Sequence, residues 1–167
     1  MRINFYALRA IYFHEMDRFR RTLIQSLLSP VLSTSLYFIV FGSVIGDYVD
    51  KIDGISYGSY IVPGLLMLTL LTQSISNTSF GIFFPKFNGT IYEILAAPIS
   101  TVEIVIAYVG AGATKTLIVA AVIFCTSLFF AEVNVKFPLL MIFLLILVAF
   151  TFALFGFLIG LISKNFE

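Results

Sequence analysis

The chain has 167 residues, of which 60% are hydrophobic and 11% are charged, and its formal net charge at pH 7 is +1. An ordinary soluble domain carries about 25% charged residues. The composition therefore excludes a free-standing soluble protein and indicates an integral membrane protein. We predict an all-α integral membrane fold, with an N-terminal amphipathic helix at the membrane surface and four transmembrane helices.

Residues 1–21 form a basic amphipathic segment ahead of the first apolar run. On a helical wheel of about 100° per residue, one face gathers Met1, Phe5, Leu8, Tyr12, Met16 and Phe19. The opposite side carries His14, Asp17, Arg18 and Arg21. This pattern predicts a helix that lies on the inner membrane surface, with its arginines among the anionic headgroups.

Four runs are long and apolar enough to cross a bilayer. They cover residues 22–46, 57–84, 102–131 and 138–162. At about 1.5 Å per residue, a helix of about 25 residues is about 37 Å long, which exceeds the hydrocarbon core of about 30 Å. A buried helix of a soluble protein would be shorter and would show a polar face. Each run is therefore predicted to span the membrane with some tilt.

The second span contains a polar stripe, and two spans contain pairs of glycines. The stripe consists of Thr69, Thr72, Gln73, Ser76 and Asn77. These spacings place the stripe on one helical face, which either joins helices through hydrogen bonds or lines a wet pathway. The lack of charge favours packing.

The glycine pairs are Gly42 with Gly46, and Gly156 with Gly160. Such pairs let helices approach closely, and they suit a contact within the chain or between copies equally.

Lys115 is a charged residue inside the third span, where a charge is costly. If the helix begins near Val102, Lys115 lies about a dozen residues into it, and its long side chain can snorkel toward the cytoplasmic headgroups. We favour this interpretation. The alternative is a cation that faces a pathway for an anionic substrate.

The positive residues are distributed unevenly along the chain. Of the ten Lys and Arg residues, Lys51 and Lys136 fall in the connections after the first and third spans. The other eight fall on the side of the N-terminus. The positive-inside rule therefore predicts that both ends and residues 84–100 face the cytoplasm.

The sequence offers no catalytic constellation. It has one His and one Cys, and the predicted spans contain neither Asp nor His. A metal cluster and an intramembrane protease dyad are therefore not expected. We predict a non-catalytic membrane subunit that needs no cofactor or metal and binds no nucleic acid.

The chain resembles the permeases of the ABC-2 family, the membrane half of ATP-binding-cassette exporters, and most of all its YadH-type subgroup. The resemblance covers the whole chain. The motifs that carry it are "SPVLSTSLYFIVFGSVIG", "YIVPGLLML", "YEILAAPIS", "IAYVGAGATK" and "LIGLISKNFE". Family permeases have six spans, so we expect this chain to be an incomplete permease that ends after the fourth span.

The resemblance implies a set of partners in the bacterial inner membrane. A permease of this kind pairs with a second copy, here expected as a homodimer, and with a cytosolic ATPase subunit that hydrolyses ATP. Residues 86–97, held between Pro85 and Pro98, would be the coupling helix that docks on the ATPase. Its candidate contacts are Lys86, Asn88, Tyr92 and Glu93. Residues 1–21 would be the connecting helix beside it.

Two other classes of function stay open from the sequence. A stand-alone pore or secondary transporter would require an intramembrane carboxylate for ion coupling. The candidate is Glu103, at the membrane edge. A purely structural membrane subunit is the third possibility.

Overall fold

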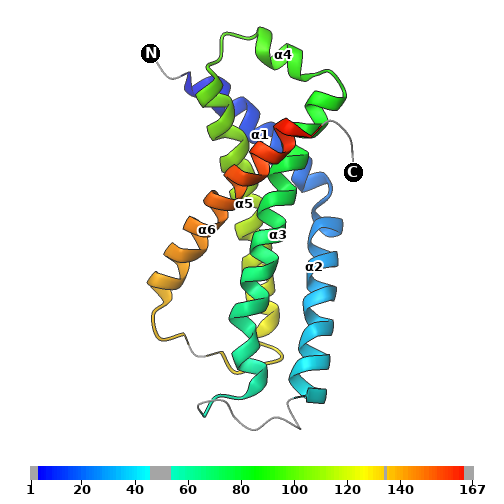
Figure 1. Ribbon diagram of the computed structural model, residues 1–167, viewed down its shortest axis with the longest axis vertical. Helices are drawn as coiled ribbons and strands as arrows, with labels where there is room; N and C mark the ends of the chain where they lie inside the picture. The colour runs from blue at the N-terminus through cyan, green and yellow to red at the C-terminus, as the bar shows by residue number, and fades with distance from the viewer. Residues whose placement is uncertain (1–3, 46–53, 134, 164–167) are drawn as a thin grey trace.

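The computed structural model describes residues 4–45, 54–133 and 135–163, and over these residues it consists of helices without a β-strand. The helices in chain order are α1 (Phe5–Arg21), α2 (Leu23–Tyr37), the π-helix η1 (Phe38–Ile45), α3 (Tyr57–Phe87), α4 (Ile91–Ala96), α5 (Thr101–Ser127) and α6 (Pro138–Ile162). Short α4 lies at one end of an elongated bundle, together with the start of α1 and the end of α6 (Figure 1). The start of α3 and the end of α5 lie at the opposite end.

In the described part of the chain, four helices are long and apolar enough to cross a membrane, namely Leu23–Phe41, α3, α5 and α6. The predicted all-α membrane fold is thereby confirmed. The central helix is α5, because 61% of its apolar 18-residue stretch is buried inside the chain. The corresponding share is 22% or less in the other three helices. The other helices direct much of their apolar surface outward, as expected for helices that contact lipid or further helices.

The segment after the second span differs from the single short helix expected over 86–97. Helix α3 continues through Pro85 to Phe87, and α4 covers only Ile91–Ala96. Asn88 is the C-cap residue of α3, and Gly89 follows it with a positive φ of 79°. Glycine adopts this left-handed conformation without a steric penalty and commonly terminates helices. The Asn-Gly turn, not Pro85, therefore separates the long helix from the short one.

The second glycine pair lies at the contact between α3 and α6. A Cβ atom built on Gly156 would lie 2.5 Å from the carbonyl oxygen of Ile75, and one on Gly160 would lie 2.6 Å from the carbonyl oxygen of Ser79. The α3 backbone therefore occupies the space that side chains at these two positions would need. This pair makes a contact inside the chain. Gly42 lies in η1, and Gly46 lies outside the described residues.

Candidate functional site

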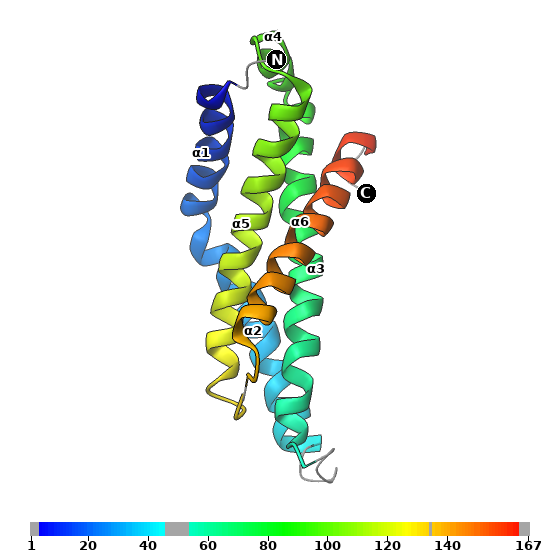
Figure 2. The same ribbon diagram turned by 90° about the vertical axis from the view of Figure 1, so that its left-hand side faces the viewer.

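Helix α1 runs alongside the first half of α5 in the same direction (Figure 2). At its start, the backbone N–H of Asn4 donates to Glu103 Oε1 at 2.5 Å. Two turns further, the Tyr12 hydroxyl donates to Thr114 Oγ1 at 3.1 Å. The face of α1 predicted to enter the membrane surface therefore packs partly against α5.

Glu103 is occupied by structural hydrogen bonds at the start of α5. Its Oε2 accepts from the backbone N–H of Ser100 at 2.8 Å, while Ser100 Oγ accepts from the backbone N–H of Glu103 at 3.3 Å. This reciprocal capping box satisfies two donors at the helix start. Because Oε1 also accepts from the backbone N–H of Asn4, the two carboxylate oxygens together hold the N-terminal starts of α1 and α5. This geometry does not favour Glu103 as an ion-coupling carboxylate.

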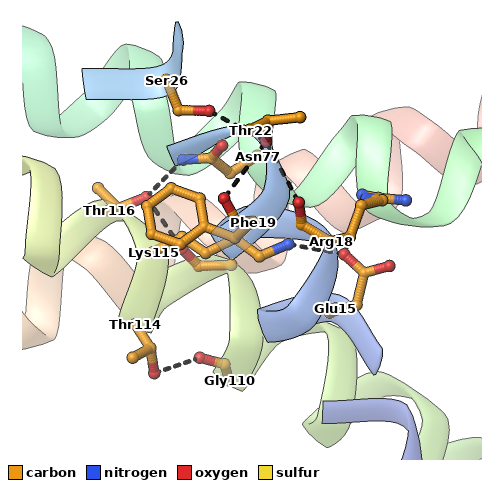
Figure 3. A network of polar contacts seen from close by, with 11 residues as sticks. Glu15, Arg18, Phe19, Thr22, Ser26, Asn77, Gly110, Thr114, Lys115 and Thr116 are labelled. Carbon is orange, nitrogen blue, oxygen red and sulfur yellow. Dashed lines mark hydrogen bonds and ion pairs between the residues drawn. The ribbon is translucent and has the colours of Figure 1, made fainter. Parts of the chain in front are cut away.

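A buried ion pair joins the other end of α1 to the middle of α5. The Lys115 ammonium donates to Glu15 Oε2 at 2.7 Å, and Arg18 Nη2 lies 2.9 Å from the same oxygen (Figure 3). Glu15 is 2% exposed and Lys115 is 4% exposed, whereas Arg18 is about a third exposed. The favoured prediction for Lys115 was therefore wrong: its ammonium does not snorkel toward headgroups, because a carboxylate inside the chain holds it.

Sequence reasoning missed Glu15, although the sequence carried a signal for it. Glu15 comes three residues after Tyr12 and four before Phe19, so it lies on the apolar face of α1. A carboxylate on a buried face requires a counter-charge, and Lys115 offers one on a predicted span. The two residues are a hundred positions apart, so only the packing of α1 on α5 brings them together.

The polar stripe of α3 separates into two parts. The hydroxyls of Thr69 and Thr72 donate to backbone carbonyls of their own helix, those of Leu65 and Leu68 respectively. Asn77 Nδ2 donates to Gln73 Oε1 at 3.5 Å and to Thr116 Oγ1 at 3.4 Å. Among the hydrogen bonds of the stripe within the described residues, only that between Asn77 and Thr116 crosses to another helix, so the stripe supports packing at that one place.

The most buried face of α3 is a neighbouring one, which contains Leu70, Ser74 and Thr78. Thr78 lies against Gly112 of α5, and a Cβ atom built on Gly112 would collide with the Thr78 hydroxyl. The absence of a side chain at Gly112 lets the two helices approach closely. The expected stripe thus lies beside the face of α3 that approaches α5 most closely.

Ser76 and Asn77 open onto a pocket of about 130 Å³. The pocket lies between the junction of α1 and α2, helix α3 and helix α5. Its lining residues are Arg18, Phe19, Thr22, Ser26, Ser76, Asn77, Phe80 and Lys115. Two cations and several hydroxyl or amide groups therefore surround a space that is large enough for several water molecules.

The candidate coupling residues differ in their surroundings. Tyr92 is 73% exposed, and Asn88 and Glu93 are also exposed. Lys86 is engaged inside the chain, because its ammonium donates to the carbonyls of Leu161 at 2.6 Å and of Ser163 at 2.8 Å. Lys86 therefore caps the end of α6, while Asn88, Tyr92 and Glu93 remain available at the surface. Within the described ranges, no cluster of His, Cys, Asp and Glu is arranged to hold a metal ion.

The sequence profile of the ABC-2 type transporter family matches residues 6–167. The chain is also similar to the inner membrane transport permease YadH of Escherichia coli K12, of Escherichia coli O157:H7 and of Shigella flexneri, with 37% identity over 167 residues in each case. These matches cover all of this chain and 65% of each relative, so the chain spans just under two thirds of their length. No solved structure matches the chain.

Proposed function

Because this chain belongs to the ABC-2 type transporter family, we propose that it forms part of the permease subunit of an ATP-binding-cassette exporter. In this proposal, the chain contributes to the path of the substrate across the inner membrane, and a separate cytosolic ATPase subunit hydrolyses ATP. A second copy of the permease completes the membrane unit. The observation that supports the proposal is α4, a short helix without a buried side chain between two spanning helices.

Helix α4 has the features of a docking element. It has six residues and no buried side chain, and it lies at one end of the bundle between two spanning helices (Figure 1). Glu93, in its first turn, and Tyr92 are both exposed. A single carboxylate beside an aromatic ring suits a basic cleft on an ATPase, and aromatic residues are enriched at such interfaces.

Two connections would pass a movement of α4 into the membrane. Through the turn at residues 88–90, α4 follows directly from α3. In the last turn of α3, Lys86 holds the carbonyls of Leu161 and Ser163 at the end of α6. A displacement of α4 by the ATPase would therefore pull on α3 and α6 together.

We further propose that the α4 end of the bundle faces the cytoplasm, as the positive-inside rule predicts. Asn88 is the residue that follows α3, just before α4, and Lys136 is an exposed residue of the connection between α5 and α6. The end of α5, where this connection begins, lies at the opposite end of the bundle from α4 (Figure 1). In a Cys125→Ser background, a membrane-impermeant thiol reagent added to intact cells should label Lys136→Cys but not Asn88→Cys. Permeabilised cells, in which both positions should react, provide the control. Labelling of position 88 alone in intact cells would reverse the proposed orientation.

Glu93→Arg tests the docking role of α4. The substitution would place a positive charge against the proposed basic cleft and leave the partner's charge unpaired, which typically costs about 2–5 kcal/mol. We expect co-purification of the co-expressed ATPase to fall by at least about tenfold, while insertion into the membrane is unchanged because Glu93 is at the surface.

Glu132→Arg is the matched control, because Glu132 is an exposed acidic residue that follows the end of α5, and the end of α5 lies far from α4 (Figure 1). This variant should keep the ATPase at the level of the unmodified chain. Unchanged co-purification with Glu93→Arg would show that α4 does not dock through its carboxylate. A loss with both variants would point to a general effect of added charge.

A further inference from the structure

We propose that the pocket between the α1–α2 junction, α3 and α5 binds a phosphate group, and that an anionic phospholipid of the adjacent leaflet supplies it. Four observations support this site: its level in the bundle, its charge, its unused hydrogen-bond donors and its size. The proposal goes beyond the transporter function and does not depend on the ATPase.

The lengths of the helices place the pocket near the boundary between hydrocarbon and headgroups. The first span begins at Leu23, directly after Thr22, which lines the pocket. Helix α3 has 31 residues and α5 has 27, which correspond to about 46 Å and about 40 Å, longer than a hydrocarbon core of about 30 Å. Because the first span begins beside the pocket, the excess length of α3 and α5 lies on the side of α1, and the pocket lies where the first span enters the core.

The charges around the pocket favour an anion. Arg18 and Lys115 both line it, and the neighbouring Glu15 is not among the lining residues. One carboxylate against two cations leaves a surplus of one positive charge beside the pocket. The Lys115 ammonium carries three donors and the Arg18 guanidinium carries five. Each has one ion-pair contact to Glu15 among the described residues.

A buried ammonium with a single partner is costly unless its other hydrogens also find acceptors. A phosphate oxygen in the pocket would accept from Lys115 and from Arg18, whose planar guanidinium binds phosphate well. The Ser76 hydroxyl lines the same space and adds a neutral donor, whereas Asn77 Nδ2 already donates to Gln73 and Thr116.

The size of the pocket suits a compact oxyanion. Its volume of about 130 Å³ is well above the about 10–15 Å³ that one water molecule requires, and it suits a tetrahedral group. Phe19 and Phe80 add apolar surface to the lining, on which the glycerol end of a phospholipid can lie.

The test measures lipid retention by the purified chain in the absence of ATPase and nucleotide, so that its result is independent of the docking experiment above. The chain is delipidated and offered phosphatidylglycerol or phosphatidylcholine with identical acyl chains, and bound lipid is counted by native mass spectrometry. We expect preferential retention of phosphatidylglycerol. Arg18→Gln should weaken that retention about tenfold.

Arg20→Gln is the matched control, because Arg20 is an exposed arginine of the same helix that does not line the pocket. It should change retention less than about twofold. Ser76→Leu tests the site without removing a charge, since its larger side chain would fill the pocket, and it should also abolish the preference. Size-exclusion profiles check that each variant remains folded.

Competition with inorganic phosphate tests whether the phosphate group in the pocket comes from a phospholipid or from a soluble compound. If inorganic phosphate displaces phosphatidylglycerol in an Arg18-dependent manner, the lipid phosphate occupies the pocket as proposed. If phosphate protects the chain from heating through Arg18 and the lipid is not retained, the pocket belongs to a soluble phosphate compound and the lipid assignment is wrong. Equal retention by Arg18→Gln and Arg20→Gln, together with no effect of phosphate, would overturn the site itself.

Discussion

Glu15→Gln is expected to destabilise the chain by about 3–5 kcal/mol, because it leaves a buried ammonium without its counter-ion. Lys115 lies in the most enclosed helix, is 4% exposed, and has its ion pair only with Glu15 among the described residues. The neutral amide can accept a hydrogen bond from the ammonium but cannot balance its charge. The substitution keeps the size of the side chain, so the loss would report on charge and not on packing.

Lys115→Met should cost less than Glu15→Gln, because Arg18 would still neutralise Glu15 at 2.9 Å. The double variant should be more stable than Glu15→Gln alone, since it removes both buried charges. The measurement is the temperature at which half of the monodisperse size-exclusion peak is lost. Arg20→Gln again serves as a control, because its ion pair with Asp17 is long and exposed. An equal loss for the two single variants, or no recovery in the double variant, would contradict this account of the ion pair.

The spanning helices could be predicted because a single physical requirement determines them. A helix that crosses hydrocarbon must be apolar over about 20 residues, and that requirement is written locally in the sequence. Helix α6 illustrates it, because its bounds, Pro138 and Ile162, are those of the expected fourth run. Proline is well suited to the first turn of a helix, and it marks this start clearly.

The contacts between helices could not be predicted, because they depend on which faces meet. The polar residues of α3 suggested one packing face, but the absence of a side chain at Gly112 lets the adjacent face with Thr78 approach α5 most closely. The partner of Lys115 was missed for a similar reason. The sequence placed Glu15 on the apolar face of α1, yet only the direction of α1 along α5 brings the two charges together (Figure 2).

Gly156→Ala and Gly160→Ala are expected to destabilise the chain by about 1–3 kcal/mol each, the typical cost of overpacking. The new methyl group at position 156 would meet the Ile75 carbonyl oxygen at 2.5 Å and the Ile75 Cα at 2.8 Å. Backbone atoms in the middle of a helix cannot rotate away as a side chain can. The two helices must therefore move apart, and the neighbouring small contacts, including Ala149 and Ala153, would be lost with them.

Gly110→Ala is the matched control, because a Cβ atom at Gly110 would meet no atom within 4 Å apart from its own stretch of the α5 backbone and its chain neighbours. By helix propensity this change should leave the chain as stable as before, or more stable by up to about 1 kcal/mol. The heating assay described for Glu15 compares the three alanine variants directly. A wider separation of α3 and α6 should also release Lys86 from the end of α6, so Lys86 should become more reactive toward an amine reagent in Gly156→Ala than in Gly110→Ala. If all three variants melt alike, the close contact between α3 and α6 does not hold the bundle together. The small residues of α6 would then serve a contact with another chain.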